Sequence, residues 1–271
     1  MEYFTHVKLT KDIYRITDFT GVCCYLVIGS QKALLLDTCN GIGNIKEYVE
    51  SITKLPITVI LSHGHLDHMG GTALFDDIYM NYLDMPVFKK HGNMEFRVED
   101  TMIHSHVKVE RKDFVETYTG EIKNIEDGQT FDAGGVHVKM ILVKGHTPGM
   151  MCPLIIEDRV CVFGDACGVG VLLFDEYSSS VSEYKESLMH LKEYESEYDT
   201  IYRNHGTFFS PKELLNNVIE CCNHILNHTD AHIPVDFHGV KLYSCCEQSE
   251  NGHGRKDGKE GNILYSKDKA N

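Results

Sequence analysis

The chain has 271 residues, a formal net charge of −14 and a hydrophobic content of 42%, which suffices for a sizeable folded core. Its Lys and Arg residues do not cluster as a phosphate-binding surface requires, so nucleic-acid processing is disfavoured. The start of the chain has no basic and apolar leader, and no stretch reaches the about 18 apolar residues of a membrane span, so we expect a cytoplasmic protein without membrane partners.

The first predicted elements are strands and one helix. Short strands are expected at 12–16 and 23–28, and a turn leads from the second into a strand at 33–36. Residues 44–52 fit an amphipathic helix, and the apolar run at 57–61 predicts a buried strand. Composition and patterning thus indicate an α/β fold.

The strand at 57–61 leads directly into Ser62-His63-Gly64-His65-Leu66-Asp67-His68. Imidazole and carboxylate groups are the ligands that Zn²⁺ and similar divalent ions take. In an extended segment, residues two apart point the same way, so His63 and His65 can bind one ion while Asp67 and His68 turn toward a second. We therefore predict a metal site here, with a solvated histidine-rich turn as the alternative.

A long charged segment with interleaved apolar residues follows at about 84–125. We expect it to be an insertion of helix and loop that covers the site and helps to set substrate choice. A surface excursion without substrate contact is the alternative. The second H-x-H in this segment, His104-Ser105-His106, has no accompanying ligand cluster, so we expect it to be exposed.

Further apolar strands end in small residues and a candidate ligand. These ends contain His146 in GHTPG, Asp165 in FGDA, His205 in NHG and Asp37 after the strand at 33–36. Polar groups at strand ends are where α/β proteins build active sites, and glycine lets the backbone turn sharply beside an ion. Cys167 also lies near Asp165 and could line the site, although we expect it to be a packing thiol.

The last third of the chain is predicted to be helical and then extended. A helix with an apolar face is expected over 177–195. A second helix is expected from Ser210 as N-cap, with Pro211 in its first turn, to about residue 227. One or two strands are expected at 235–245, before a mobile tail rich in Gly, Lys and Asp.

Together the motifs SHGHLDH, GHTPG, FGDA and NHG resemble those of the metallo-β-lactamase-fold hydrolases, especially the branch with glyoxalase II-like thioesterases, over about residues 10–210. The resemblance implies an α/β fold built as a four-layer αβ/βα sandwich. It also implies a catalytic domain at 1–210 that contains the insertion, and a C-terminal helix and strand extension of the same domain at 211–271. Glyoxalase II proper has a longer helical C-terminal domain that binds the glutathione moiety, so we do not expect glutathione thioesters.

The resemblance also implies the roles of individual residues. One metal would be held by His63, His65 and His146, a second by Asp67, His68 and His205, and Asp165 would bridge both. Asp67 and Asp165 would act in catalysis. Asp37 would orient a ligand histidine by a hydrogen bond, with an ordinary turn or N-cap aspartate as the alternative. Some lactonase relatives have a tyrosine that acts as a substrate donor, and Tyr177, twelve residues after Asp165, is a candidate for this role, with core or surface packing as the alternative.

The implied activity is hydrolysis of a small-molecule ester, thioester or lactone by a hydroxide that bridges two divalent metals. Zn²⁺ is the expected metal, with Fe or Mn as alternatives. The motifs also admit a mononuclear iron dioxygenase of persulfides, and less readily a phosphodiesterase or a β-lactamase. We expect a small-molecule substrate and no nucleic-acid or membrane partner. The family includes homodimers, so a homodimer is one oligomeric state to consider.

Overall fold

The computed structural model describes residues 2–104, 108–249 and 254–271. The chain folds into two compact units. The first unit contains 1–140 with 155–158 and 204–206, and the second contains 141–154, 159–203 and 207–271. The predicted division into 1–210 and 211–271 stays a prediction. In the described part of the chain, no helix has the length and apolar character that crossing a membrane requires.

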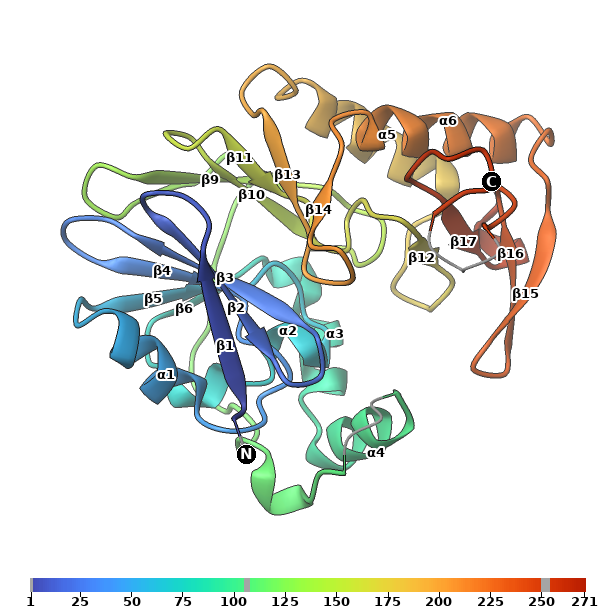
Figure 1. Cartoon of the computed structure of the whole chain (residues 1–271). Coiled ribbons are helices and arrows are strands. Elements are labelled where there is room, and N and C mark those ends of the chain that lie inside the picture. Colours follow the sequence, from blue (N-terminus) through green and yellow to red (C-terminus); the bar gives the residue numbers. More distant parts are fainter. Residues whose placement is uncertain (1, 105–107, 250–253) are drawn as a thin grey trace. The chain divides into compact units, whose positions relative to one another are not determined.

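The first unit is built on a seven-stranded sheet in the sequence order β1 to β7 (Figure 1). Its strands are β1 (Phe4–Lys8), β2 (Ile13–Asp18), β3 (Cys23–Ile28), β4 (Ala33–Leu36), β5 (Ile57–Ile60), β6 (Ile78–Met80) and β7 (Lys123–Asn124). Neighbours are antiparallel from β1 to β4 and parallel from β4 to β7. The parallel pairing brings the carboxyl ends of β4 and β5, where Asp37 and the histidine-rich motif follow, to the same edge of the sheet.

Helices pack on this sheet and continue into the insertion. α1 (Ile45–Ile52) begins at the N-cap Asn44, whose side chain accepts a hydrogen bond from Glu47 N. α1 buries Ile45 and Val49 in the apolar core of the sheet. α2 (Leu66–Met69) carries part of the histidine motif, and α3 (Met85–His91) and α4 (Met94–His104) lie in the segment predicted to be an insertion. Helices and loops thus make up most of residues 84–125, and the interpretation of this segment as an insertion stays a prediction.

A buried arginine of α4 ties the insertion to the ligand-bearing loops. Arg97 is 1% exposed and donates hydrogen bonds to the carbonyl oxygens of Asn40 (3.0 Å), Gly70 (2.9 Å) and Val115 (2.8 Å). Gly70 directly follows α2, and Asn40 lies in the loop after β4. Each charged hydrogen bond of this kind contributes about 1.5–3 kcal/mol. The insertion thus supports the loops on which the candidate ligands lie.

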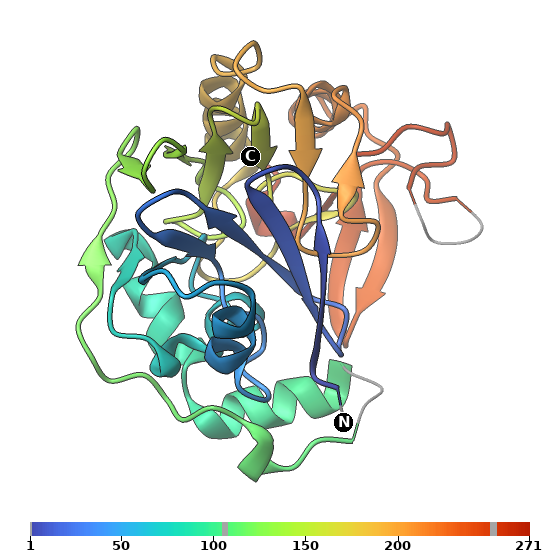
Figure 2. The ribbon, with the colours of Figure 1, turned by 60° about the vertical axis from the view of Figure 1, so that its left-hand side comes forward.

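A six-stranded sheet has the order β14-β13-β11-β10-β9-β8. Its strands are β8 (Thr130–Asp132), β9 (His137–Leu142), β10 (Met151–Ile155), β11 (Val160–Val162), β13 (Thr200–Tyr202) and β14 (Phe209–Ser210). In the second unit, α5 (Val181–Lys192) and α6 (Leu214–Leu226) lie side by side (Figures 1 and 2). The candidate ligands of this unit, His146 and Asp165, lie in the loops after β9 and β11.

A third, four-stranded sheet completes the second unit. Its order is β12 (Val171–Leu173), β17 (Ile263–Tyr265), β16 (Val240–Ser244) and β15 (Ile233–Phe237). The tail was expected to be mobile from residue 247, but it supplies β17, which is buried between two neighbours. This strand is only three residues long and follows a polar stretch, so its apolar run is too short to predict a strand from the sequence.

Two predicted helix starts differ from the structure. The helix expected from residue 177 begins only after Ser180, which forms a reciprocal capping box with Glu183. The helix expected from Ser210 begins at Leu214, so the predicted N-cap was wrong. Ser210 instead belongs to β14 and pairs with Ile201 of β13. Tertiary pairing overrides the local capping preference at this position.

Candidate metal centre

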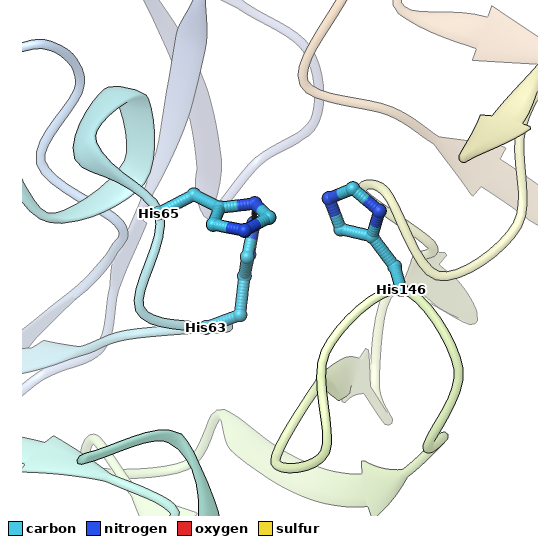
Figure 3. A group of neighbouring side chains, drawn as sticks. All are labelled: His63, His65 and His146. Carbon is cyan, nitrogen blue, oxygen red and sulfur yellow. Dashed lines mark hydrogen bonds between the residues drawn. The ribbon is translucent and has the colours of Figure 1, made fainter. Parts of the chain in front are cut away.

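The loop after β5 presents His63 and His65 side by side (Figure 3). Their facing atoms, His63 Nε2 and His65 Nδ1, lie 3.1 Å apart. Two nitrogen ligands of one tetrahedral zinc ion, each at about 2.0–2.1 Å, lie about 3.3 Å from each other. The pair is therefore spaced to share an ion.

Glycine is required between these two histidines. The N–H of Gly64 donates to Asp84 Oδ2 at 2.8 Å, at the start of α3. A Cβ atom at position 64 would lie 2.6 Å from the backbone nitrogen of Phe88, closer than real Cβ contacts allow. The insertion therefore holds the turn that sets the spacing of His63 and His65. Asp84 was missed from the sequence, because only the fold brings it to the motif.

Asp37 lies at the centre of the hydrogen bonds that orient the ligands. It is 2% exposed and has a φ of 69°, a backbone conformation that is uncommon for a non-glycine residue. Its Oδ2 atom lies 2.8 Å from His68 Nδ1 and also accepts from the Ser62 hydroxyl at 2.8 Å. Asp37 thus accepts hydrogen bonds beside a candidate ligand histidine, and its role in orienting a metal ligand stays a prediction.

These hydrogen bonds select the ring nitrogens that face the candidate site. Because Nδ1 of His68 donates to the Asp37 carboxylate, its Nε2 keeps a lone pair. The Ser62 hydroxyl donates to Asp37 and can accept from Nδ1 of His63 at 2.9 Å, so Nε2 of His63 is also left to bind a cation. Ser62 belongs to the predicted motif, yet its role became visible only in three dimensions.

A second group of ligands in the first unit forms a nearly equilateral triangle. Asp67 Oδ2 lies 3.4 Å from His68 Nε2 and 3.2 Å from His205 Nε2, and the two imidazole nitrogens lie 3.2 Å apart. All three edges match the separation of ligands on one tetrahedral ion with bonds of about 2.0–2.2 Å. The triangle leaves its open side for a further ligand or a substrate.

The acidic member of this triangle is held ionised. Burial raises the pKa of Asp67, but the electrostatic interaction with His68 and the hydrogen bonds with His205 and His68 outweigh this effect and hold the pKa well below its ordinary value. A carboxylate must be deprotonated to bind a metal. Asp67 is therefore ready to bind a cation at neutral pH.

Asn204 positions His205 from the neighbouring position. Its side-chain N–H donates to the carbonyl of Cys23 at 2.6 Å and to Asp37 Oδ2 at 3.3 Å, and Cys23 N donates to its carbonyl at 2.9 Å. These contacts place the segment beside β3 and the Asp37 carboxylate. The NHG motif indicated the histidine, but nothing in the sequence indicated the task of its asparagine.

In the second unit, His146 and Asp165 lie together. His146 Nδ1 donates to the carbonyl of Leu172 at 3.0 Å, which directs Nε2 toward Asp165 Oδ2 at 3.7 Å. His146 stands on the loop after β9, as Figure 3 shows. The GHTPG and FGDA motifs thus meet at one place in this unit.

Tyr184 of α5 fixes both of these loops. Its hydroxyl donates to the carbonyl of Ala166 at 2.6 Å, directly after Asp165. Its ring occupies the space that a Cβ atom at Gly145 would need, directly before His146. Tyr184 was predicted only as a core residue of a helix face, and its contacts with the two ligand loops could not be derived from helical spacing.

Two further candidates have contrasting surroundings. Cys167 is fully buried in the apolar core of the second unit, so the expected packing thiol is confirmed. Tyr177 is half-buried in the loop after β12, and its backbone N–H bonds to Asp175. The two residues that follow form hydrogen bonds with the loop that carries His146. The Ser178 hydroxyl donates to the carbonyl of His146, and the backbone N–H of Ser179 donates to the carbonyl of Gly145. The role of Tyr177 as a substrate donor stays a prediction.

The second H-x-H motif, at 104–106, lies largely outside the described residues.

Comparisons with known proteins agree on one family. The family model described as the metallo-beta-lactamase superfamily matches residues 17–198. The chain is 23% identical to the probable polyketide biosynthesis zinc-dependent hydrolase BaeB of Bacillus velezensis, over 73% of this chain and 78% of that protein. It is 22% identical to the human acyl-coenzyme A thioesterase MBLAC2, over 68% of this chain and 74% of that protein.

A solved structure has the same fold. The metallo-beta-lactamase from Pontibacter korlensis matches 81% of this chain and 99% of its own chain, with a TM-score of 0.60 at 13% sequence identity. Similarity at this level of identity shows the fold alone. The predicted α/β fold is thereby confirmed, whereas the glyoxalase II-like branch stays a prediction.

Proposed function

Because the chain belongs to the metallo-beta-lactamase superfamily, we propose that it hydrolyses an ester, thioester or lactone bond of a small molecule with two divalent metal ions. Its family and its zinc-dependent hydrolase and thioesterase relatives make it a metallo-hydrolase. What we propose beyond this is that two ions are bound and that the cleaved bond is an ester, thioester or lactone. The observation that carries it is the Asp67, His68 and His205 triangle with edges of 3.2–3.4 Å.

The candidate ligands sort into two sets, each of a size that could hold one ion. As the family's motif positions imply, we propose that the first set is His63, His65 and His146 and that the second is Asp67, His68 and His205. The donors are nitrogen and carboxylate oxygen, which suit divalent zinc. We assign the first ion to the first set and the second ion to the second set, with Asp165 as the bridge between them.

Divalent ions bound here would supply a water of lowered pKa and a polarised carbonyl oxygen. The chain's own residues prepare the site for that chemistry. Asp37 and Ser62 present the Nε2 lone pairs of His63 and His68, and Asp67 stays ionised. The Asp165 carboxylate lies beside His146 Nε2, where it can accept and pass on a proton of the attacking water. No side-chain nucleophile is needed.

A thioester is the substrate class to test first. The relatives include an acyl-coenzyme A thioesterase and a zinc-dependent hydrolase, and both activities are hydrolytic. The acidic balance of the chain, with 40 Asp and Glu against 26 Lys and Arg, argues against a polyphosphate-binding groove and favours recognition of the acyl part. Esters and lactones of matching acyl groups belong in the same panel.

The test is turnover of this panel by the zinc-loaded full chain and by His205→Asn. We expect thioester hydrolysis that depends on zinc and is lost in the variant, because one corner of the triangle is removed. His6→Asn is the matched control, since His6 is an exposed imidazole of β1 in the same unit. Equal turnover by His205→Asn and the wild type would contradict the proposal.

One observation also favours a second function. Asp67, His68 and His205 are two histidines and one carboxylate on a single face, which is the ligand set of non-haem iron oxygenases. A mononuclear iron dioxygenase of persulfides is therefore the second candidate. Oxygen uptake with a persulfide by iron-loaded protein, without zinc-dependent hydrolysis, would select it.

A further inference from the structure

Three cysteine side chains of the second unit form a group that contains none of the candidate histidine and aspartate ligands. Cys221 lies on α6, and Cys245 and Cys246 follow directly after β16. Cys221 Sγ lies 3.7 Å from Cys246 Sγ, which in turn lies 3.9 Å from Cys245 Sγ. All three sulfur atoms lie within 4.8 Å of one another.

From this geometry, we infer that Cys221, Cys245 and Cys246 form a thiolate site for a soft divalent cation of the zinc class, separate from the proposed hydrolytic centre. Sulfur ligands of one tetrahedral zinc ion, each at about 2.3 Å, lie about 3.8 Å apart. The separations of 3.7 Å between Cys221 Sγ and Cys246 Sγ and of 3.9 Å between Cys246 Sγ and Cys245 Sγ bracket this value. A directly bonded sulfur pair would instead lie at about 2.05 Å.

The backbone around these cysteines is held from several sides. Cys245 N donates to the carbonyl of Ile263 in β17, and Ala231 N donates to the carbonyl of Cys245. The side chain of Asn262 accepts from Cys246 N at 3.0 Å and donates to its carbonyl at 3.1 Å. The two adjacent thiols are thereby fixed before any cation arrives, which lowers the entropic cost of binding.

A buried arginine completes the surroundings of the sulfur atoms. Arg255 is 7% exposed, and its Nη1 lies 3.8 Å from Cys221 Sγ. The same guanidinium group bonds to the Asp257 carboxylate at 3.1 and 2.5 Å, and Glu220 lies 3.7 Å from it. A cationic donor favours the thiolate form, which is the form that binds metals. Three thiolates and a divalent ion would carry one net negative charge, and this charge would lie beside the guanidinium group.

A cation and a further ligand can reach the site from solvent. A hollow of about 460 Å³ lies beside it and is lined by Cys245, Cys246 and Arg255 together with His224, Asp230 and Glu247. Cys246 is half-buried, whereas Cys221 and Cys245 are fully buried. The half-buried thiol therefore forms the entrance, and the fourth coordination position faces the hollow, where a water or a small thiol can bind.

Cadmium is the probe, because its bonds to thiolates give an ultraviolet charge-transfer absorption that histidine and carboxylate ligands do not give. The proposed hydrolytic ligands include no cysteine, so this absorption reports on the thiol site alone. The full chain, first loaded with zinc and kept under a phosphine reductant, is titrated with Cd²⁺. We expect an absorption that saturates at one equivalent and is lost in Cys246→Ala and Cys245→Ser.

Cys222→Ala is the matched control, since Cys222 is the next residue of α6 but lies in the apolar core outside the group. It should keep the absorption. Arg255→Gln should weaken cadmium binding by about 10- to 100-fold, as expected for a partner of a metal ligand. Circular dichroism and thermal melting of each variant separate loss of binding from loss of folding.

The proposal is overturned if wild-type protein shows no such absorption, or if Cys246→Ala keeps it in full. Alkylation with mass spectrometry provides a second readout. Bound Zn²⁺ should protect Cys246, which is the accessible thiol, in the wild type and in Cys222→Ala. Equal alkylation of Cys246 with and without Zn²⁺ would also overturn the proposal.

Discussion

In the first unit the candidate ligands are oriented by a buried carboxylate, whereas in the second unit they are held by neutral groups. Asp37 bonds to His68 and, through Ser62, to His63. His146 instead donates to the backbone carbonyl of Leu172. A carboxylate raises the basicity of the imidazole that it binds, while a backbone carbonyl mainly fixes its orientation. We therefore expect the first unit to determine metal affinity and the second to determine placement.

The largest effect should come from the carboxylate that we propose as the bridge. Asp165→Asn removes a negative charge beside His146 and should lower hydrolytic turnover by orders of magnitude, with a weaker dinuclear site. Steady-state kinetics and metal content of the purified variant would measure this. Turnover near that of the wild type would contradict the bridging role of Asp165.

Asp37→Asn should have the next largest effect, on metal affinity. The Asp37 carboxylate accepts from Ser62 N and Ser62 Oγ, and an amide in its place turns a donor toward one of these groups. We expect metal binding about 10- to 100-fold weaker, measured by competition with a chromogenic chelator.

The matched control for Asp37→Asn is Asp77→Asn. Asp77 is a half-exposed carboxylate that bonds to Thr58 and Lys123 in the same unit, away from the ligand loops. Its loss should leave metal affinity unchanged. If both variants bind metal as tightly as the wild type does, the orienting role of Asp37 is wrong.

A smaller effect is expected from Tyr184→Phe in the second unit. The variant cannot donate a hydrogen bond to Ala166, so the buried carbonyl group of Ala166 loses this partner. The free energy of unfolding should therefore fall by about 1–3 kcal/mol. Because the placement of both ligand loops depends on this tyrosine, turnover should fall while metal affinity changes little. Denaturant unfolding and kinetics provide the two measurements.

Tyr198→Phe is its control, because the Tyr198 hydroxyl is buried and has no hydrogen-bond partner in the described part of the chain. Removing it should be neutral or stabilising. Equal destabilisation by the two substitutions would show that the Tyr184 hydroxyl has no special task.

The smallest effect concerns an exposed counterpart of the Asp37 and His68 pair. His137 Nδ1 lies 2.6 Å from Glu157, and this hydrogen bond raises the pKa of His137 above its ordinary value. Since the folded-state pKa is raised, the stabilisation is present in full below the unfolded-state pKa of about 6.5 and is lost as pH rises through the folded-state value. Unfolding of wild type and Glu157→Gln across this range should show a small difference that vanishes at alkaline pH. A difference that grows with pH would contradict this.

The candidate ligands could be predicted from the sequence because each follows an apolar strand within a short motif. The groups that orient them could not, because contacts between distant segments create them. Asp84 reaches Gly64 across 20 positions, and Asn204 reaches Asp37 across 167. Strand β1 has only Phe4 buried, so its pattern gives no alternation to detect. Local patterns thus indicated the candidate ligands, whereas burial and long-range hydrogen bonds determine how these side chains are oriented.

The most direct test of the central claim is the metal content of the full chain with the Cys246→Ala substitution, purified without added metal and measured by mass spectrometry. This substitution removes the proposed thiol site, so the ions counted belong to the histidine and aspartate ligands. The account predicts about two zinc ions per chain, falling to about one after Asp67→Ala is added. A single iron ion per chain, or a zinc content that Asp67→Ala leaves unchanged, would contradict it.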